Sequence, residues 1–251
     1  QVAWRTLLFV LVFPTAFFYS AVYTEALFLL GLVGSLYHAR RGQWGRAALF
    51  AAAASATKIA GFILLPVLLL EVLRQRAPLL RRPYPLVAPL GAALGGLTYF
   101  VWLQWRFGDF SVFFDVERAW HRQSLDPVFF LGIQRLLGST DALYFYPPNS
   151  VPLRTPFLLL DTTLIWVFLA AGVYLWWRVR PSYGALVAGL ALLPALSGSP
   201  QSVNRYVAVA FPAFILLARI SWEPLRNALA VASTLGLALT TYLFVQGYWA
   251  G

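Results

Sequence analysis

The sequence predicts an all-α, polytopic membrane protein. Of its 251 residues, 60% are hydrophobic and only 11% are charged, whereas soluble domains carry roughly a quarter charged residues. The mean hydropathy is +0.71. This composition excludes an ordinary soluble globule and indicates a chain whose solvent is a lipid bilayer.

Eight apolar segments divide the chain, and several approach the about 20 residues that a membrane-crossing helix requires. They cover residues 4–19, 25–37, 46–73, 85–105, 156–177, 184–196, 206–220 and 227–246. Hydropathy falls between them over residues 107–154, where aromatic side chains are frequent. We expect this stretch to be an outer loop with amphipathic helices at the membrane interface, or only an interfacial lid.

The third segment, residues 46–73, is long enough to cross once, but it has Lys58 and Gly61 near its middle. A charge beside glycine at that depth indicates two half-helices that form a re-entrant hairpin. With a hairpin, 12 arginines lie on the cytoplasmic side and 6 outside; with a straight crossing the division is 10 against 8. The positive-inside rule therefore favours the hairpin.

The formal net charge of +10 comes from arginines that we expect to anchor cytoplasmic loops, so it does not predict nucleic-acid binding. The chain has no cysteine, which excludes disulfides, thiolate metal sites and a cysteine nucleophile. A possible acidic metal motif, Asp115-Val116-Glu117, would not share one helical face and is better explained as solvated charge. The Gly91 and Gly95 pair is typical of a helix-packing face.

Ionisable side chains in apolar segments are candidates for function. Glu25 could instead be a favourable charge at a helix start, and Lys58 an internal partner for a carboxylate or for freed carbonyls. Asp161 could pair with Arg154 at the outer interface, and Arg205 could anchor its helix there.

On the outer side, we expect Lys58, Arg205 and Arg122 to form a cationic pocket that fits the phosphate of a lipid. Arginine donates hydrogen bonds in a planar fork, and lysine acts as a point charge.

Four blocks of sequence resemble the bacterial PIG-V-like homologues of the second GPI mannosyltransferase, within the GT-C superfamily of membrane glycosyltransferases. The blocks are residues 13–28, residues 56–61, Phe107-Gly108-Asp109 followed by Trp120-His121-Arg122, and Asn204-Arg205-Tyr206 leading to Phe211-Pro212. The chain departs from the family in having Lys58-Ile59-Ala60-Gly61 where the family carries Arg-Pro-Thr-Gly, which keeps a cation but changes its geometry.

The resemblance implies a single GT-C-type transmembrane bundle over residues 1–251, in a bacterial cytoplasmic membrane with its active site on the outer face. It also implies inverting transfer of a hexose, mannose by analogy, from a polyprenyl-phosphate sugar to an extracytoplasmic glycan or lipid acceptor. Lys58, Arg205 and Arg122 would hold the donor phosphate. The sugar or acceptor would contact Tyr23, Tyr206 and Trp120.

In the family, the catalytic carboxylate lies in the first outer loop, after the first membrane helix. The chain contains no methionine and starts at Gln1, so we expect the general base upstream and the fragment alone to be inactive. Glu25 and Asp109 are weaker candidates for that base. No nucleotide is required, and the need for a metal is open, since these carboxylates or an upstream one could hold a divalent ion through oxygen ligands.

Two other classes of function fit the same pattern. A broken helix with a charged tip is also found in transporters, so a flippase or transporter of lipid-linked or anionic substrates is one alternative. The chain shows no internal repeat of the kind that many transporters have. A non-catalytic subunit that binds polyprenyl lipid is the other alternative.

Overall fold

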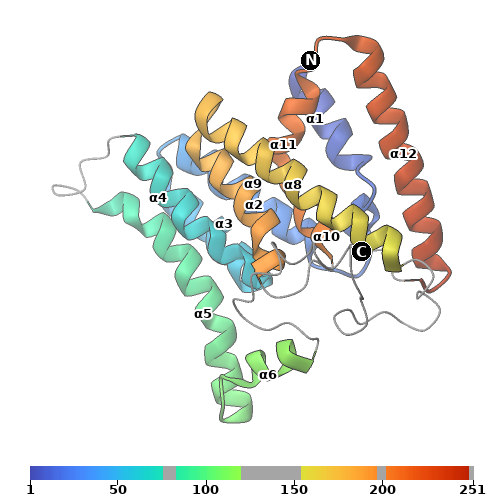
Figure 1. Ribbon diagram of the computed structural model, residues 1–251. Coiled ribbons are helices and arrows are strands. Elements are labelled where there is room, and N and C mark those ends of the chain that lie inside the picture. The colour runs from blue at the N-terminus through green and yellow to red at the C-terminus, as the bar shows by residue number, and fades with distance from the viewer. Residues whose placement is uncertain (76–82, 120–153, 197–201, 249–251) are drawn as a thin grey trace. The chain divides into compact units, whose positions relative to one another are not determined.

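The structure, a computed structural model, describes residues 1–75, 83–119, 154–196 and 202–248, and all regular structure in these ranges is helical (Figure 1). The all-α prediction is therefore confirmed for this part of the chain. The chain divides into two compact units, which are described separately. The first unit comprises Gln1–Ala21, Glu117–Val173 and Val187–Gly251, and the second comprises Val22–Val116 and Tyr174–Leu186.

The second unit is built mainly on four helices connected in sequence. They are α2 (Glu25–Arg40), α3 (Trp44–Thr57), α4 (Leu64–Arg74) and α5 (Val87–Phe107), with a 3-10 turn at Ile59–Ile63, another at Tyr84–Leu86, and the start of α6 (Val112–Ala119) after α5. Small residues allow these helices to approach closely. A Cβ atom on Gly31 would lie 2.7 Å from the Cβ of Ala54, and one on Gly95 would lie 2.2 Å from the carbonyl oxygen of Ala52.

The order of these contacts sets the helix directions. Gly34 of α2 contacts Phe50 while Gly31 contacts Ala54, so α2 and α3 are antiparallel. Gly91 contacts Ala48, and Gly95, one turn later in α5, contacts Ala52, one turn later in α3. The helices α3 and α5 therefore run parallel. The predicted packing role of the glycine pair in α5 is confirmed.

The apolar segment at 46–73 breaks at Lys58, whose backbone is extended, with φ −150° and ψ 133°. The chain then folds back, because Gly61 packs against Ser55 so tightly that a Cβ atom would lie 2.3 Å from its Cα. At the far end of α4, Gln75 donates a hydrogen bond of 3.0 Å to the carbonyl of Ala39. The C-terminal end of α4 therefore lies beside the C-terminal end of α2, and the chain passes from that end of α2 into α3.

The first unit contains α1 (Val2–Leu11), a 3-10 turn (Ala16–Tyr19), α10 (Val203–Ala208), α11 (Phe211–Ala218) and α12 (Glu223–Val245). The long helices α8 (Arg154–Arg178) and α9 (Pro181–Leu196) each contribute to both units. Three rings from different elements, Phe13, Phe168 and Phe214, meet edge to face with centroids 5.3–6.3 Å apart. They join the end of α1 to α8 and α11 within the core of this unit.

Two apolar segments that were expected to be continuous are divided in this unit. In the segment at 4–19, α1 ends at Leu11 and a 3-10 turn follows, since Pro14 lacks a backbone N–H and its ring would clash with the preceding turn. In the segment at 206–220, α10 stops at Ala208 and α11 begins at Phe211, with Pro212 in its first turn. Proline is favoured at that position because its fixed φ suits a helix start.

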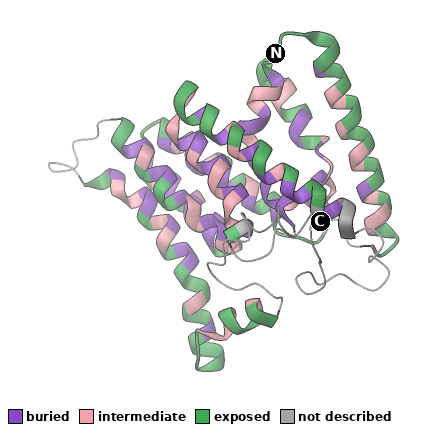
Figure 2. Cartoon of the chain, viewed as in Figure 1, coloured by how far each residue is buried: buried purple, intermediate pink, exposed green. Residues whose placement is uncertain are grey.

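Among the described residues, three helices are long and apolar enough to cross a membrane: Tyr84–Phe107, Leu159–Arg178 and Glu223–Val245. They correspond to the predicted segments at 85–105, 156–177 and 227–246. In Figure 2, α12 is exposed along most of its length, and its exposed side chains include Val231, Leu235 and Leu239. A stripe of this kind is unfavourable in water and suited to lipid. The described helices are therefore consistent, by length and composition, with an α-helical membrane protein.

Candidate functional site

The break after α3 places a buried ion pair at one end of the second unit. Glu25, the first residue of α2, has a fully buried side chain, and Lys58 follows the last residue of α3. Their Oε1 and Nζ atoms are 3.1 Å apart. The pair forms because α2 and α3 are antiparallel, so that the start of one helix lies beside the end of the other.

Local electrostatics favour each member of this pair. A carboxylate is stabilised at a helix N-terminus and a cation at a helix C-terminus by the helix dipoles. The ammonium of Lys58 also lies 5.9 Å from the ring centre of Phe28, within the range of a cation–π interaction. Both structural roles proposed from the sequence, a helix-start charge at Glu25 and a carboxylate partner for Lys58, are confirmed.

A pocket of about 330 Å³ opens beside Lys58. It is lined by Ser55, Ala56, Thr57, Lys58, Ile59, Gly96, Tyr99 and Phe113. The lining thus combines one cation, hydroxyl groups and two aromatic rings, and all of it belongs to the second unit. Its volume lies in the range of small-molecule pockets, about 300–1,000 Å³. The pocket can therefore take an anionic group together with a ring-sized neutral group.

Asp109, the other carboxylate considered as a base, lies in the exposed turn after α5. It accepts hydrogen bonds from the backbone N–H of Ser111 at 2.7 Å and from its hydroxyl at 2.9 Å. These two bonds lower the pKa of Asp109 below its ordinary value. Asp115 is exposed, and the described residues contain no group of three acidic or histidine side chains placed to hold a metal ion.

A second polar cluster lies in the first unit, where two of the sequence blocks that carry the family resemblance meet. The hydroxyl of Thr15 donates to the carbonyl of Asn204 at 3.0 Å, and that of Tyr19 donates to the carbonyl of Ala208 at 2.8 Å. The guanidinium of Arg205 lies 4.5 Å from the ring centre of Phe18. Two hydrogen bonds and one contact between a guanidinium and an aromatic ring thus connect the 3-10 turn and the residue before it to α10.

Three further residues singled out from the sequence differ in burial and belong to different units. Asp161 is buried and accepts a hydrogen bond of 3.3 Å from the amide of Asn204, while the side chain of Arg154 lies outside the described residues. Tyr206 is buried in the first unit, and Tyr23 is 40% exposed just before α2 in the second.

The three cations predicted to form one pocket do not all belong to one unit of the described chain. Lys58 belongs to the second unit and Arg205 to the first. Arg122 and Trp120 lie outside the described residues. The pocket beside Lys58 belongs to the second unit, and the cluster around Arg205 belongs to the first.

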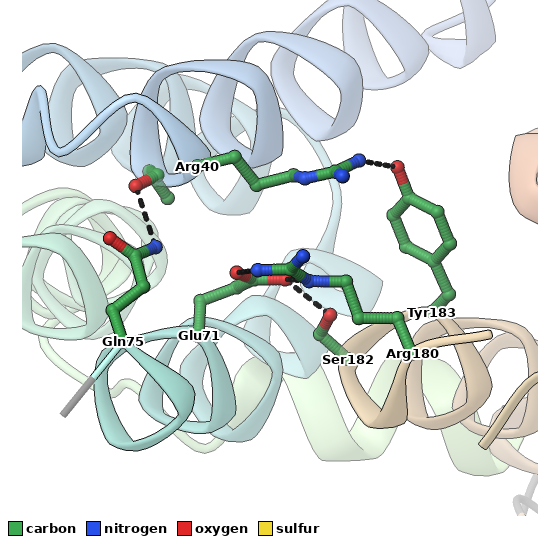
Figure 3. A network of polar contacts seen from close by, with 7 residues as sticks. Arg40, Glu71, Gln75, Arg180, Ser182 and Tyr183 are labelled. Atoms are coloured by element: carbon green, nitrogen blue, oxygen red, sulfur yellow. Dashed lines mark hydrogen bonds and ion pairs between the residues drawn. The ribbon is translucent and has the colours of Figure 1, made fainter. Parts of the chain in front are cut away.

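Sequence reasoning missed a buried charge cluster in the second unit, drawn in Figure 3. Arg180 holds the carboxylate of Glu71 with two hydrogen bonds of 2.7 Å, and the hydroxyl of Ser182 donates to the same carboxylate. Nearby, Arg40 donates to the hydroxyl of Tyr183. Glu71 could have been found by the rule applied to Lys58, because it is also a charged residue in the apolar segment at 46–73.

No protein-family model, curated protein or solved structure matches this chain.

Proposed function

We propose that this chain is an integral membrane glycosyltransferase. It takes a hexose, mannose by analogy with the family it resembles, from a polyprenyl-phosphate donor and transfers it with inversion to an extracytoplasmic acceptor. The observation that carries the proposal is the position of Lys58, a cation at a helix break that borders a pocket with hydroxyl and aromatic side chains.

The pocket matches the chemistry of a lipid-linked sugar phosphate. The ammonium of Lys58 supplies a positive charge for the phosphate, and charge-assisted hydrogen bonds of this kind are the strong ones. Tyr99 and Phe113 provide aromatic surface beside it, and Thr57 provides a hydroxyl. The volume of about 330 Å³ accommodates a phosphate and one hexose ring.

The re-entrant hairpin is part of the same proposal. The 14 residues of α3 and the 11 of α4 span about 21 and 16 Å at 1.5 Å per residue, less than the about 30 Å of a hydrocarbon core. A hairpin made of these helices would enter the membrane and return to the same side, with Lys58 at its tip.

In this proposal, Glu25 is the counter-ion of Lys58, and a carboxylate that acts as general base removes the proton of the acceptor hydroxyl. Lys58 stabilises the phosphate that leaves the sugar C1 atom, which is where negative charge develops. Within the second unit, Tyr23 is proposed as a contact of the sugar or the acceptor.

The test is transfer of radiolabelled mannose from polyprenyl-phosphate mannose to membrane acceptors in liposomes, with the full-length reading frame. Lys58→Gln should weaken donor binding tenfold to a hundredfold, roughly the effect of one charge-assisted hydrogen bond, and Lys58→Arg should retain part of it. The matched control is Arg74→Gln, which removes a positive charge from the exposed end of α4.

Three results would contradict the proposal. Equal donor binding by Lys58→Gln and Arg74→Gln would show that Lys58 does not hold the phosphate. Movement of labelled lipid across the vesicle without covalent transfer would identify a transporter or flippase. Donor binding without transfer or movement, by a folded full-length protein, would identify a lipid-binding subunit.

A further inference from the structure

Asp161 is a buried carboxylate in a candidate membrane span, and the proposed transferase chemistry does not use it. It is 4% exposed, lies near the start of the span Leu159–Arg178, and accepts a 3.3 Å hydrogen bond from the amide of Asn204. The ion pairs formed by the described residues all involve other carboxylates. The backbone N–H of Ser202 also donates to it, but a buried carboxylate that no cation among the described residues neutralises is costly.

Two residues that adjoin this carboxylate, one along the chain and one through its backbone amide, each have a buried oxygen atom without a hydrogen-bond partner among the described residues. The atoms are Oγ1 of Thr162, the residue after Asp161, and Oδ1 of Asn204, whose backbone amide contacts Asp161. The two residues are only 8% and 2% exposed. Buried polar atoms are almost always satisfied, so two such atoms on residues that adjoin a buried carboxylate call for a partner that the chain itself does not supply among the described residues.

The neighbouring threonine shows that this arrangement is unusual. A threonine inside a helix commonly donates its hydroxyl to the carbonyl four residues earlier. Thr163 does so, with a 2.7 Å bond to Leu159. Thr162 forms no such bond, although its backbone belongs to the same helix.

The kind of ligand follows from charge and from the number of atoms to be satisfied. A proton on Asp161 would neutralise the carboxylate, but it can form only one hydrogen bond and leaves another oxygen unsatisfied. A water molecule could bond to several of these atoms but brings no charge. A cation would supply the missing charge and would also accept oxygen ligands from these three residues. Oxygen ligands favour a hard ion, and one carboxylate balances a single positive charge.

We propose that Asp161, Thr162 and Asn204 form a binding site for a hard monovalent cation, with sodium as the ion to test. The cation joins α8 to the start of α10, within the first unit. The backbone carbonyl of Asn204 also accepts a hydrogen bond from the hydroxyl of Thr15. The guanidinium of the next residue, Arg205, lies over the ring of Phe18. Cation binding therefore orders the segment that carries Arg205. This inference is independent of the proposed transferase activity.

The experiment is thermal unfolding of the purified full chain in detergent, followed by tryptophan fluorescence. Sodium chloride is titrated against choline chloride at constant ionic strength, and a parallel titration uses potassium chloride. A ligand that binds only the folded state should raise Tm in a saturable way. Thr162→Val should raise the apparent Kd for sodium about tenfold, as expected for the loss of one ligand atom, and Asp161→Asn should abolish the effect.

The matched control is Thr163→Val, the same substitution one residue later, at an exposed hydroxyl that already has a partner. It should leave the sodium dependence unchanged. A Tm of the unsubstituted chain that is the same in sodium, potassium and choline would overturn the proposal and assign the oxygen atoms to water or a proton. Equal sodium dependence in the Thr162 and Thr163 variants would also overturn it. The unsubstituted chain and these two variants decide the question even if Asp161→Asn does not fold.

Discussion

The ion pair between Glu71 and Arg180 provides the sharpest test of how the second unit is stabilised. Glu71 is fully buried, and the side chain of Arg180 is 19% exposed. Replacing Glu71 by glutamine keeps the volume but removes the charge that holds the guanidinium through two 2.7 Å hydrogen bonds. The variant leaves Arg180 largely buried without its counter-charge, which is the costly way to break a buried pair.

The expected cost is about 3 kcal/mol, the lower end of the range for removing one partner of a buried pair, because Arg180 keeps some contact with solvent. For a chain of this length, such a loss lowers Tm by roughly 6–12 °C. The assay is thermal unfolding in detergent, observed through the 10 tryptophans. The control is Glu223→Gln, since Glu223 is 72% exposed and 3.1 Å from Arg226. That change should cost less than about 1 kcal/mol.

A double-mutant cycle with Arg180→Gln makes the test stricter. If Glu71 and Arg180 act as a pair, the double variant should be less destabilised than the sum of the single variants, by roughly 2 kcal/mol. The reasoning is refuted if Glu71→Gln shifts Tm no more than Glu223→Gln does, or if the coupling energy is zero.

Two further substitutions test the packing of each unit. Gly95→Leu should prevent α5 from lying against α3, since even a Cβ atom would be 2.2 Å from a backbone oxygen; fluorescence-detected size-exclusion chromatography should show loss of the monodisperse peak, and a normal peak would contradict the packing. Thr15→Val removes the hydrogen bond to the buried carbonyl of Asn204 and should lower unfolding stability by about 1 kcal/mol. Thr6→Val, whose hydroxyl bonds within its own helix, should have a smaller effect in the same unfolding assay, and equal effects would argue against the long-range bond.

The positions of most helices follow from the sequence because their signals are local. Apolar length predicts the three candidate spans, and the charge beside Gly61 predicts the break at Lys58. The proline in the segment at 4–19 carried the information that the helix stops early, but hydropathy alone does not register it. The small residues of α5 likewise predict a close helix contact without saying which helix makes it.

The partners of the buried charges could not be predicted in the same way. Lys58 and Glu25 are 33 residues apart, and Glu71 and Arg180 are 109 apart. Sequence patterns relate residues within one or two helical turns, whereas these pairs depend on which helices pack together and in which direction. Asp161 illustrates the point, because its contact with the amide of Asn204, 43 residues further along the chain, could not be read from the sequence.

The sequence by itself predicted the helical class, the three candidate spans and the break at Lys58, because apolar length and charge act through a few consecutive residues. Only the tertiary structure decided that Lys58 contacts a buried carboxylate and borders a pocket, and that Thr162 and Asn204 have buried oxygen atoms without partners. Those features arise where separate segments meet, and the free energy of burying a charge or an oxygen atom depends on the groups that the fold brings to it.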